Sequence, residues 1–215
     1  MIRSSAITVL ALTGLAAVAS ADIRITEVSA YGSGNSPFAA DWIELTNFSV
    51  AAVDITGWRF DDDSAAFASG VALSGVTSIA AGESVVFLNS TTATTNFINA
   101  WFGGTSPSGL QFGTYTGSGS GLSTGGDQVN IYNNTGTLIT GVAFGASPAI
   151  NFATFDNSVG NTGTIGQLSV IGTNGAFAYT LSAFTETGSP GIIPAPGAAA
   201  LLGLGGLLAA RRRRA

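Results

Sequence analysis

Asp41-Trp42-Ile43-Glu44-Leu45-Thr46-Asn47 is the stretch that decides the fold class. Ile43 and Leu45 alternate with Trp42 and Glu44, which is the period of two expected of a β-strand with two different faces. The runs on either side have the same character: Ile23 to Val28 precedes the stretch, and Val53 to Phe60 follows it. The central part of the chain therefore predicts consecutive short strands.

The remaining segments extend this pattern. Short apolar runs bounded by Gly, Asn and Ser predict further strands, whereas one segment has the i, i+3, i+4 spacing of a helix. The expected strands are 84–88, 128–132, 138–144, 167–171 and 176–181, the expected helix is 94–102, and 103–126 is expected to be a long surface loop. Short strands separated by turns favour a β-sandwich or barrel over a parallel α/β sheet.

Two details of side-chain placement can be predicted. Residues 128–132 and 138–144 flank a turn of Asn and Gly, so Val129 and Ile131 should face Leu138, Thr140 or Val142 across a hairpin. In the first strand, Glu27 falls in phase with apolar neighbours, where a carboxylate is unexpected.

Composition excludes several classes of function. The chain has no histidine and no cysteine, which excludes Ser-His-Asp and Cys-His catalysis, His-ligated zinc, haem and iron–sulfur sites. All twelve acidic residues but only Arg24 and Arg59 lie in residues 22–191, so this part has a formal charge of −10, against −5 for the chain. A domain with this charge is unsuited to binding phosphate backbones, and we expect no nucleic-acid partner.

The N-terminus has the features of a secretory signal peptide. Arg3 precedes an apolar run from Ala6 to Val18, and Ala19-Ser20-Ala21 then forms a small-x-small cleavage site directly before the first acidic residue, Asp22. We expect signal peptidase to cleave after Ala21, which makes residues 1–21 a signal peptide and the rest an exported protein.

The C-terminus reads as a second targeting segment, residues 192–215. Pro194-Ala195-Pro196 precedes the apolar run from Ala198 to Ala210, and Arg211, Arg212, Arg213 and Arg214 follow. As a short hydrophobic helix this run would be about 20 Å long, against a hydrocarbon core of about 30 Å. The arginines should remain cytoplasmic, so the segment would anchor the chain in the membrane, either transiently or permanently.

This order of parts resembles the PEP-CTERM sorting signal of Gram-negative, exopolysaccharide-producing bacteria. In that family a Pro-Glu-Pro motif precedes an apolar helix and a basic tail, and a membrane protease, exosortase, is thought to cut near the motif. Ala195 stands where the family name implies Glu. The resemblance implies an exosortase-like partner and a location at the cell surface. An ordinary membrane anchor is the alternative.

Residues 22–191 resemble the lamin-tail domain, an immunoglobulin-like β-sandwich found in nuclear lamins and in secreted bacterial proteins. The resemblance is strongest over residues 41–61, and the Gly-rich segment 103–121 is longer than the family usually needs. Further matching stretches are 25–28, 79–83, 122–132 and Ser189-Pro190-Gly191. The resemblance implies an all-β fold and carries no catalytic residues.

The candidate sites are few. Asp61, Asp62 and Asp63 could bind Ca²⁺, although adjacent side chains diverge and a strand-ending turn is the plainer interpretation. Trp42, Trp58 and Trp101 could form a sugar-stacking platform, but tryptophans at strand positions more often pack in a core. A third possibility is an acid/base pair formed by Glu27 and Glu44 on neighbouring strands.

Together these features favour an exported structural or adhesive surface protein that is not an enzyme, associated with extracellular polysaccharide or the envelope. Two alternatives remain, a calcium- or glycan-binding surface module and a carboxylate-dependent hydrolase.

Overall fold

The computed structural model describes residues 21–148 and 152–192, and within these ranges the chain is mostly β-structure with one short helix. The strands are β1 (Ile23–Ser29), β2 (Trp42–Asn47), β3 (Val53–Asp54), β4 (Arg59–Asp61), β5 (Val71–Ser74), β6 (Ser78–Ile79), β7 (Ser84–Leu88), β8 (Gln111–Tyr115), β9 (Asp127–Tyr132), β10 (Leu138–Phe144), β11 (Phe155–Asp156), β12 (Gly163–Ile165), β13 (Phe177–Leu181) and β14 (Phe184–Gly188), and the helix is α1 (Thr94–Phe102).

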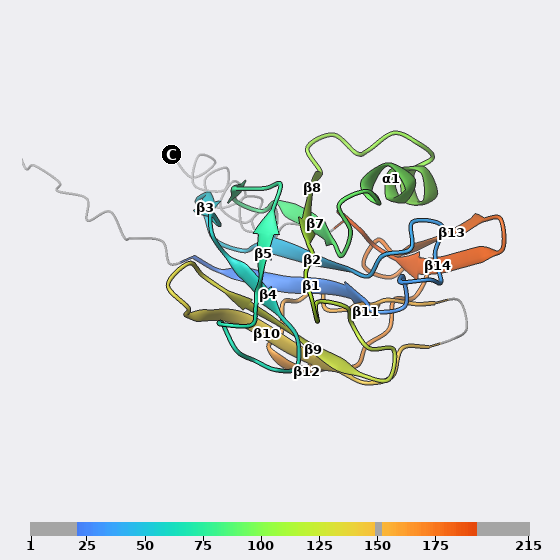
Figure 1. The fold of residues 1–215 in the computed structure, drawn as a ribbon. Coiled ribbons are helices and arrows are strands. Elements are labelled where there is room, and N and C mark those ends of the chain that lie inside the picture. The colour runs from blue at the N-terminus through green and yellow to red at the C-terminus, as the bar shows by residue number, and fades with distance from the viewer. Residues whose placement is uncertain (1–20, 149–151, 193–215) are drawn as a thin grey trace, which may run out of the picture.

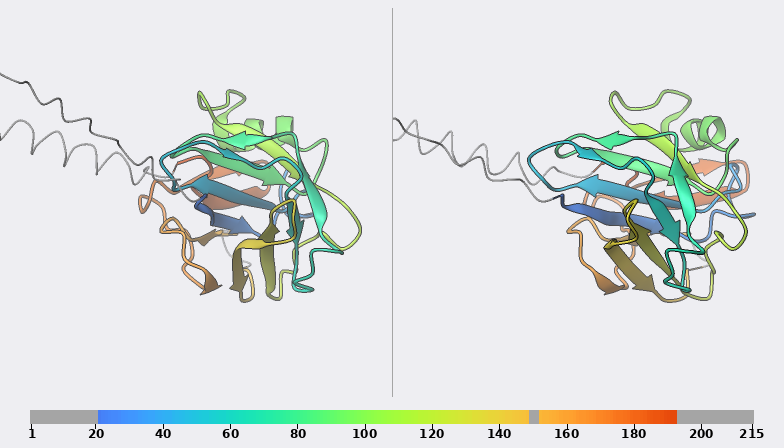
Figure 2. Two further views of the ribbon diagram at one scale, coloured as in Figure 1. Left: turned by 90° about the vertical axis from the view of Figure 1, so that its left-hand side faces the viewer. Right: turned by 60° about the vertical axis from the view of Figure 1, so that its left-hand side comes forward.

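Ten of the strands form one continuous sheet that folds back on itself into two layers (Figures 1 and 2). Their order is β11-β1-β2-β7-β8-β5-β4-β9-β10-β12, so β8 and β5 carry the sheet from one layer to the other. The largest apolar cluster fills the space between the layers, with Ile25, Leu45 and Phe87 from one layer and Ile131 and Phe144 from the other. This is the sandwich arrangement that the alternating strands predict.

A second apolar cluster covers the outer face of the β1–β2–β7 layer. There α1 and the β13–β14 hairpin lie against the sheet, and Trp42, Phe97 and Trp101 meet edge to face or tilted at centroid distances of 5.6 to 6.0 Å. The helix forms because Phe97, Ala100 and Trp101 share one buried stripe. Both faces of this layer are therefore buried, which is why most of its polar residues, including Glu27, Glu44 and Thr46, are out of contact with solvent.

The structure confirms most of the expected elements. β2, β7 and α1 have the predicted bounds within one residue, and β9 and β10 form the predicted hairpin with Val129 opposite Val142 and Ile131 opposite Thr140. In β1, a register shift between Ile25 and Glu27 changes which face the side chains occupy. Ile25 and Val28 both reach the inter-layer core, whereas Glu27 lies on the outer face with Glu44.

Other expectations were wrong. The expected strand 53–60 is interrupted by a turn at Gly57, which has φ of +76°, so that β3 and β4 are separate strands in different sheets. The expected loop 103–126 contains β8, which pairs in parallel with β7. Residues 167–171 contribute only an isolated bridge, at Leu168. No sequence pattern predicted the strands β5, β6, β11, β12 and β14.

The targeting segments fall largely outside the described residues. The apolar run of the expected signal peptide, with Ala19, lies there, and so do Pro194, Pro196, the expected C-terminal helix and Arg211 to Arg214. Among residues 21–148 and 152–192, no helix is long and apolar enough to cross a membrane.

Candidate functional site

Glu27 and Glu44 are directly opposite each other across the β1–β2 ladder, as the sequence suggested for neighbouring strands. Their side chains are 1% and 0% exposed, so neither carboxyl group faces solvent. An acid/base pair for hydrolysis must reach its substrate, and this pair is covered instead by the end of the domain.

Each carboxyl group accepts a backbone hydrogen bond from that covering segment. The Ser189 amide donates to Glu27 Oε1 at 2.8 Å, and the Gly191 amide donates to Glu44 Oε2 at 2.5 Å. Three hydroxyls also donate to the pair: Ser189 Oγ donates to Glu27 Oε2 at 3.1 Å, Thr154 Oγ1 to Glu27 Oε1 at 2.5 Å, and Thr26 Oγ1 to Glu44 Oε1 at 2.8 Å. We call Glu27, Glu44 and residues 188–191 the carboxyl clamp.

Two glycines let the chain pass this closely over the carboxyl groups. A Cβ at Gly188 would lie 2.6 Å from Glu27 Oε1, nearer than packing allows. Gly191 has φ of +74°, in the left-handed region that favours glycine. The clamp therefore depends on the sequence Gly188-Ser189-Pro190-Gly191 as much as on the glutamates.

Burial perturbs these acids and their neighbours. Burial, together with the negative charge of Glu44, raises the pKa of Glu27, and burial raises that of Glu44 against the hydrogen bonds from Gly191 and Thr26. Burial also raises the pKa of Glu186 to about 8, although Tyr179 Oη donates to it at 2.9 Å, and the pKa of Asp41 to about 6. These groups hold their protons more tightly in the folded chain than in the unfolded chain.

The raised pKa values predict a pH dependence of stability. An unfolded carboxyl group titrates near pH 4, so the folded state binds more protons than the unfolded state from about pH 4 to about pH 8. The free energy of unfolding should therefore fall as the pH rises through this window. Urea unfolding at pH 5, 6, 7 and 8 measures it, and Glu44→Gln should flatten the slope. Stability that rises with pH over this range would contradict the assignment.

The three aspartates of the proposed calcium site are not brought together. Asp61 is buried and its carboxylate accepts hydrogen bonds from Ser64 Oγ, Ala66 N and Ser69 Oγ at 2.8 to 3.1 Å, which fixes the loop that follows β4. Asp62 accepts from the Ser64 amide, and Asp63 is exposed. Among the described residues, no three His, Cys, Asp or Glu side chains are placed to hold a metal ion.

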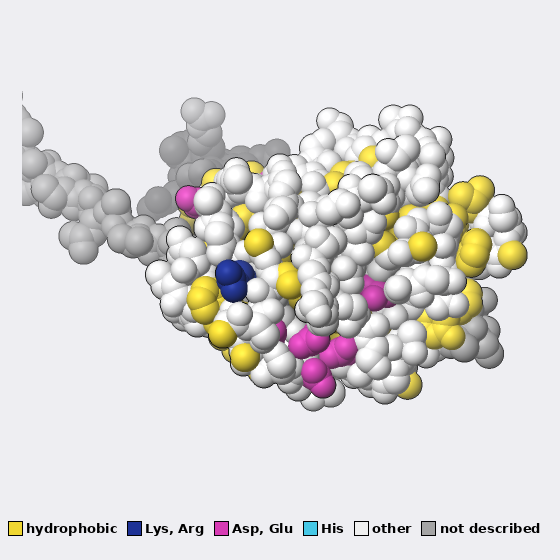
Figure 3. Space-filling model, in the orientation of Figure 1, with side chains coloured by type: hydrophobic (Ala, Val, Ile, Leu, Met, Phe, Trp, Pro, Cys, Tyr) yellow, Lys and Arg dark blue, Asp and Glu magenta, His cyan; other side chains and the backbone are white. Residues whose placement is uncertain are grey.

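The tryptophans are core residues, as the preferred interpretation held. Trp42, Trp58 and Trp101 are 0%, 5% and 4% exposed. None offers an open ring face to a sugar, so the platform hypothesis is wrong. The face drawn in Figure 3 is mostly uncharged, with a group of acidic side chains near its lower centre, further acidic side chains apart from this group, and a basic patch.

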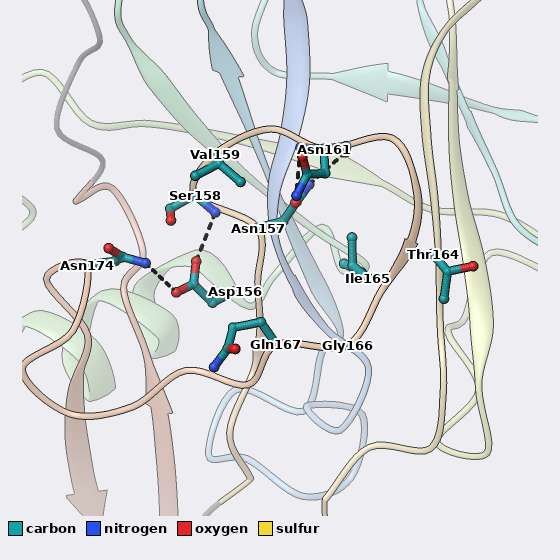
Figure 4. Close-up of a pocket in the computed structure, with 10 residues that line it drawn as sticks. All are labelled: Asp156, Asn157, Ser158, Val159, Asn161, Thr164, Ile165, Gly166, Gln167 and Asn174. Carbon is teal, nitrogen blue, oxygen red and sulfur yellow. Dashed lines mark hydrogen bonds between the residues drawn. The ribbon is translucent and has the colours of Figure 1, made fainter.

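A polar hollow lies beside the edge strand β12, and Figure 4 shows the side chains that line it. Its volume is about 250 Å³. The Asp156 carboxylate accepts from the Ser158 amide at 2.8 Å and from Asn174 Nδ2 at 2.7 Å, so two separate loops meet there. Asn174 has φ of +49°, an uncommon backbone conformation that its bond to Asp156 helps to hold.

A second hollow of about 380 Å³ lies on the other side of β12. Gln128 and Asn130 of β9 and Ile139, Gly141 and Ala143 of β10 line it, together with Thr162 and Thr164. Thr164 lines both hollows, which are therefore neighbours separated by β12.

No sequence pattern predicts either hollow. Their residues come from loops rich in Asn, Thr and Gly, and this composition is also that of ordinary turns. For the clamp, the sequence shows an acid, Glu27, in phase with the apolar residues of its strand. Ser189, which binds Glu27, lies 162 residues away along the chain, and no local pattern connects the two.

The sequence matches a known protein family. The family model of the lamin tail domain matches residues 16–146, which is more than half of the chain. No curated protein matches the sequence. The match covers β1 to β10. It ends before the residues that line the first hollow and before residues 188–191 of the carboxyl clamp. On the match and on the two-layered β-fold, the chain belongs to the lamin tail domain family.

Proposed function

We propose that this chain is an exported surface protein whose lamin tail domain serves a structural or adhesive function without enzymatic activity, and whose C-terminal segment sorts it to the cell envelope. The carboxyl clamp is the observation that supports this most directly. It uses the best candidate acid/base pair to hold residues 188–191 against the domain, so this pair contributes to structure rather than to hydrolysis.

The position of the clamp also suits sorting. Gly191 is held through its backbone amide, and the Pro194-Ala195-Pro196 motif begins three residues later. Proline disfavours helix in itself and in the residue before it, which favours a motif that a protease can reach, next to a fixed anchoring point on the domain. We infer that the sorting segment starts where the clamp ends.

Substitution of the C-terminal arginines tests the sorting function. Replacing Arg211 to Arg214 with Ser should remove the charges that stop translocation, because an arginine at the bilayer centre costs about 2.5–3.5 kcal/mol. Uncut protein should then appear in the medium, as measured by immunoblotting of cell and medium fractions from a host with the matching protease. Replacement of the same four residues with Lys is the matched control and should be sorted like the parent.

If the Ser variant is retained and processed like the parent, the arginines are not part of the signal and this proposal for the C-terminus fails.

A further inference from the structure

We propose that the two hollows on either side of β12 form a binding site for a neutral polysaccharide, with the chain of sugars lying across the edge strand. The site is built from residues 128–143, 156–167 and 174, so the first hollow lies outside the region that the family match covers and the second lies mostly inside it. The inference goes beyond the proposed function, which does not specify what the domain touches at the cell surface.

The first hollow offers the hydrogen-bonding groups that sugar hydroxyls require. Each oxygen of the Asp156 carboxylate accepts one hydrogen bond within the protein and has capacity for another. The side-chain amide of Asn161 and the hydroxyl of Ser158 make no hydrogen bond to other described residues, and both line the hollow. Carboxylate, amide and hydroxyl groups together can satisfy hydroxyls that act as both donors and acceptors.

The preorganisation of this hollow also favours a ligand site. Asp156 is 7% exposed and is fixed by the Ser158 amide and by Asn174, which reaches it from another loop (Figure 4). Asn157 is held by its bonds to the Ile25 carbonyl and to the Asn161 backbone, so the base of the loop is fixed as well. A ligand meeting these groups would not have to order them, which lowers the entropic cost of binding.

The second hollow supplies a complementary surface. Ile139, Ala143 and Gly141 give it an apolar floor for the C–H faces of sugar rings, and Asn130 and Gln128 border this floor with amides. Figure 4 shows the Thr164 side chain turned away from Asp156. The backbone of β12 therefore faces the first hollow, and the Thr164 side chain faces the second. Volumes of about 250 and 380 Å³ suit small ligand units in succession rather than one bulky group.

Charge decides which polysaccharide fits. Among the residues that the structure describes, Asp156 is the only charged one that lines either hollow, and no lysine or arginine does. An anionic polymer would meet this carboxylate on a domain of formal charge −10, and neither Arg24 nor Arg59 lines the hollows to pair with it. The site therefore favours a neutral glycan over an anionic one.

Affinity electrophoresis of the full chain tests the proposal, in native gels containing a detergent without a sugar headgroup. The gels contain dextran, xylan, galactomannan or soluble starch as neutral probes, and alginate as the anionic probe. At least one neutral polysaccharide should retard the chain, and alginate should not. Thr164→Arg, which places a long charged side chain between the hollows, and Asn161→Ala should each weaken the retardation at least tenfold.

Asn96→Ala on α1 is the matched control, since Asn96 is exposed and lines neither hollow. It should migrate like the parent in every gel. Asn161 and Thr164 are also exposed, so both site variants should unfold in urea like the parent. No retardation by any neutral probe, retardation by alginate alone, or retardation that survives both site variants would overturn the proposal. Binding is measured on purified chain, so these outcomes are independent of sorting.

Discussion

Replacing Glu27 with alanine is expected to lower the free energy of unfolding by about 3–5 kcal/mol, because it leaves three buried donors without their acceptor, and urea denaturation at pH 5.5 measures the loss. At this pH the raised pKa values keep Glu27 and Glu44 largely protonated. Removing Glu27 therefore does not remove a buried negative charge, and the measured change reports the lost hydrogen bonds. The substitution removes the acceptor of the Ser189 amide, the Ser189 hydroxyl and the Thr154 hydroxyl, all buried. A buried donor left without an acceptor costs about 1–3 kcal/mol.

Two controls separate the clamp from a general effect of removing an acid. Glu27→Gln keeps an acceptor oxygen and a similar volume, so it should lose less than half as much stability. Asp63→Ala makes the same formal charge change at an exposed position and should stay within about 0.5 kcal/mol of the parent. If Glu27→Ala unfolds at the urea concentration of the parent, the clamp does not stabilise the domain.

Trp42→Ala is expected to cost a similar amount, about 3–5 kcal/mol, because the side chain is fully buried between the sheet and α1. Its ring meets those of Phe97 and Trp101 edge to face at centroid distances of 5.6 and 5.9 Å. Such aromatic pairs add about 0.5–1.5 kcal/mol each beyond their buried area. Thermal unfolding followed by circular dichroism measures the loss.

Trp42→Phe is the matched variant. Within the described residues, the Trp42 indole N–H is buried without a hydrogen-bond partner, so phenylalanine removes an unsatisfied donor while keeping an aromatic ring. We expect it to lose less than half of what alanine loses. An alanine variant as stable as the parent would mean that α1 does not depend on this ring.

The strands that the sequence predicts well are those in which one face is apolar. β2 and the β9–β10 hairpin alternate cleanly, so their existence and pairing follow from period and turn residues. β8 could not be found in this way, because Gln111-Phe112-Gly113-Thr114-Tyr115 sits among Gly and Ser residues. Its pairing with β7 and β5 makes it a strand, and long-range pairing leaves no local signal.

The clamp could be predicted only in part. Glu27 and Glu44 stand out as acids in apolar strands, and antiparallel pairing of β1 with β2 would bring them together. The bulge at Thr26 and the arrival of residues 188–191 depend on tertiary structure. The hollows beside β12 could not be predicted, since they arise where loops of ordinary turn composition meet.

The intact mass of the protein recovered from the cell surface tests export and sorting together. We expect a chain that begins at Asp22 and ends near residue 195, after export and cleavage beside the clamped end of the domain. Recovery, from a host with the matching protease, of a surface form that still contains Leu207 and the four arginines would contradict cleavage at the sorting motif. A chain that retains residues 1–21 and stays inside the cell would contradict export.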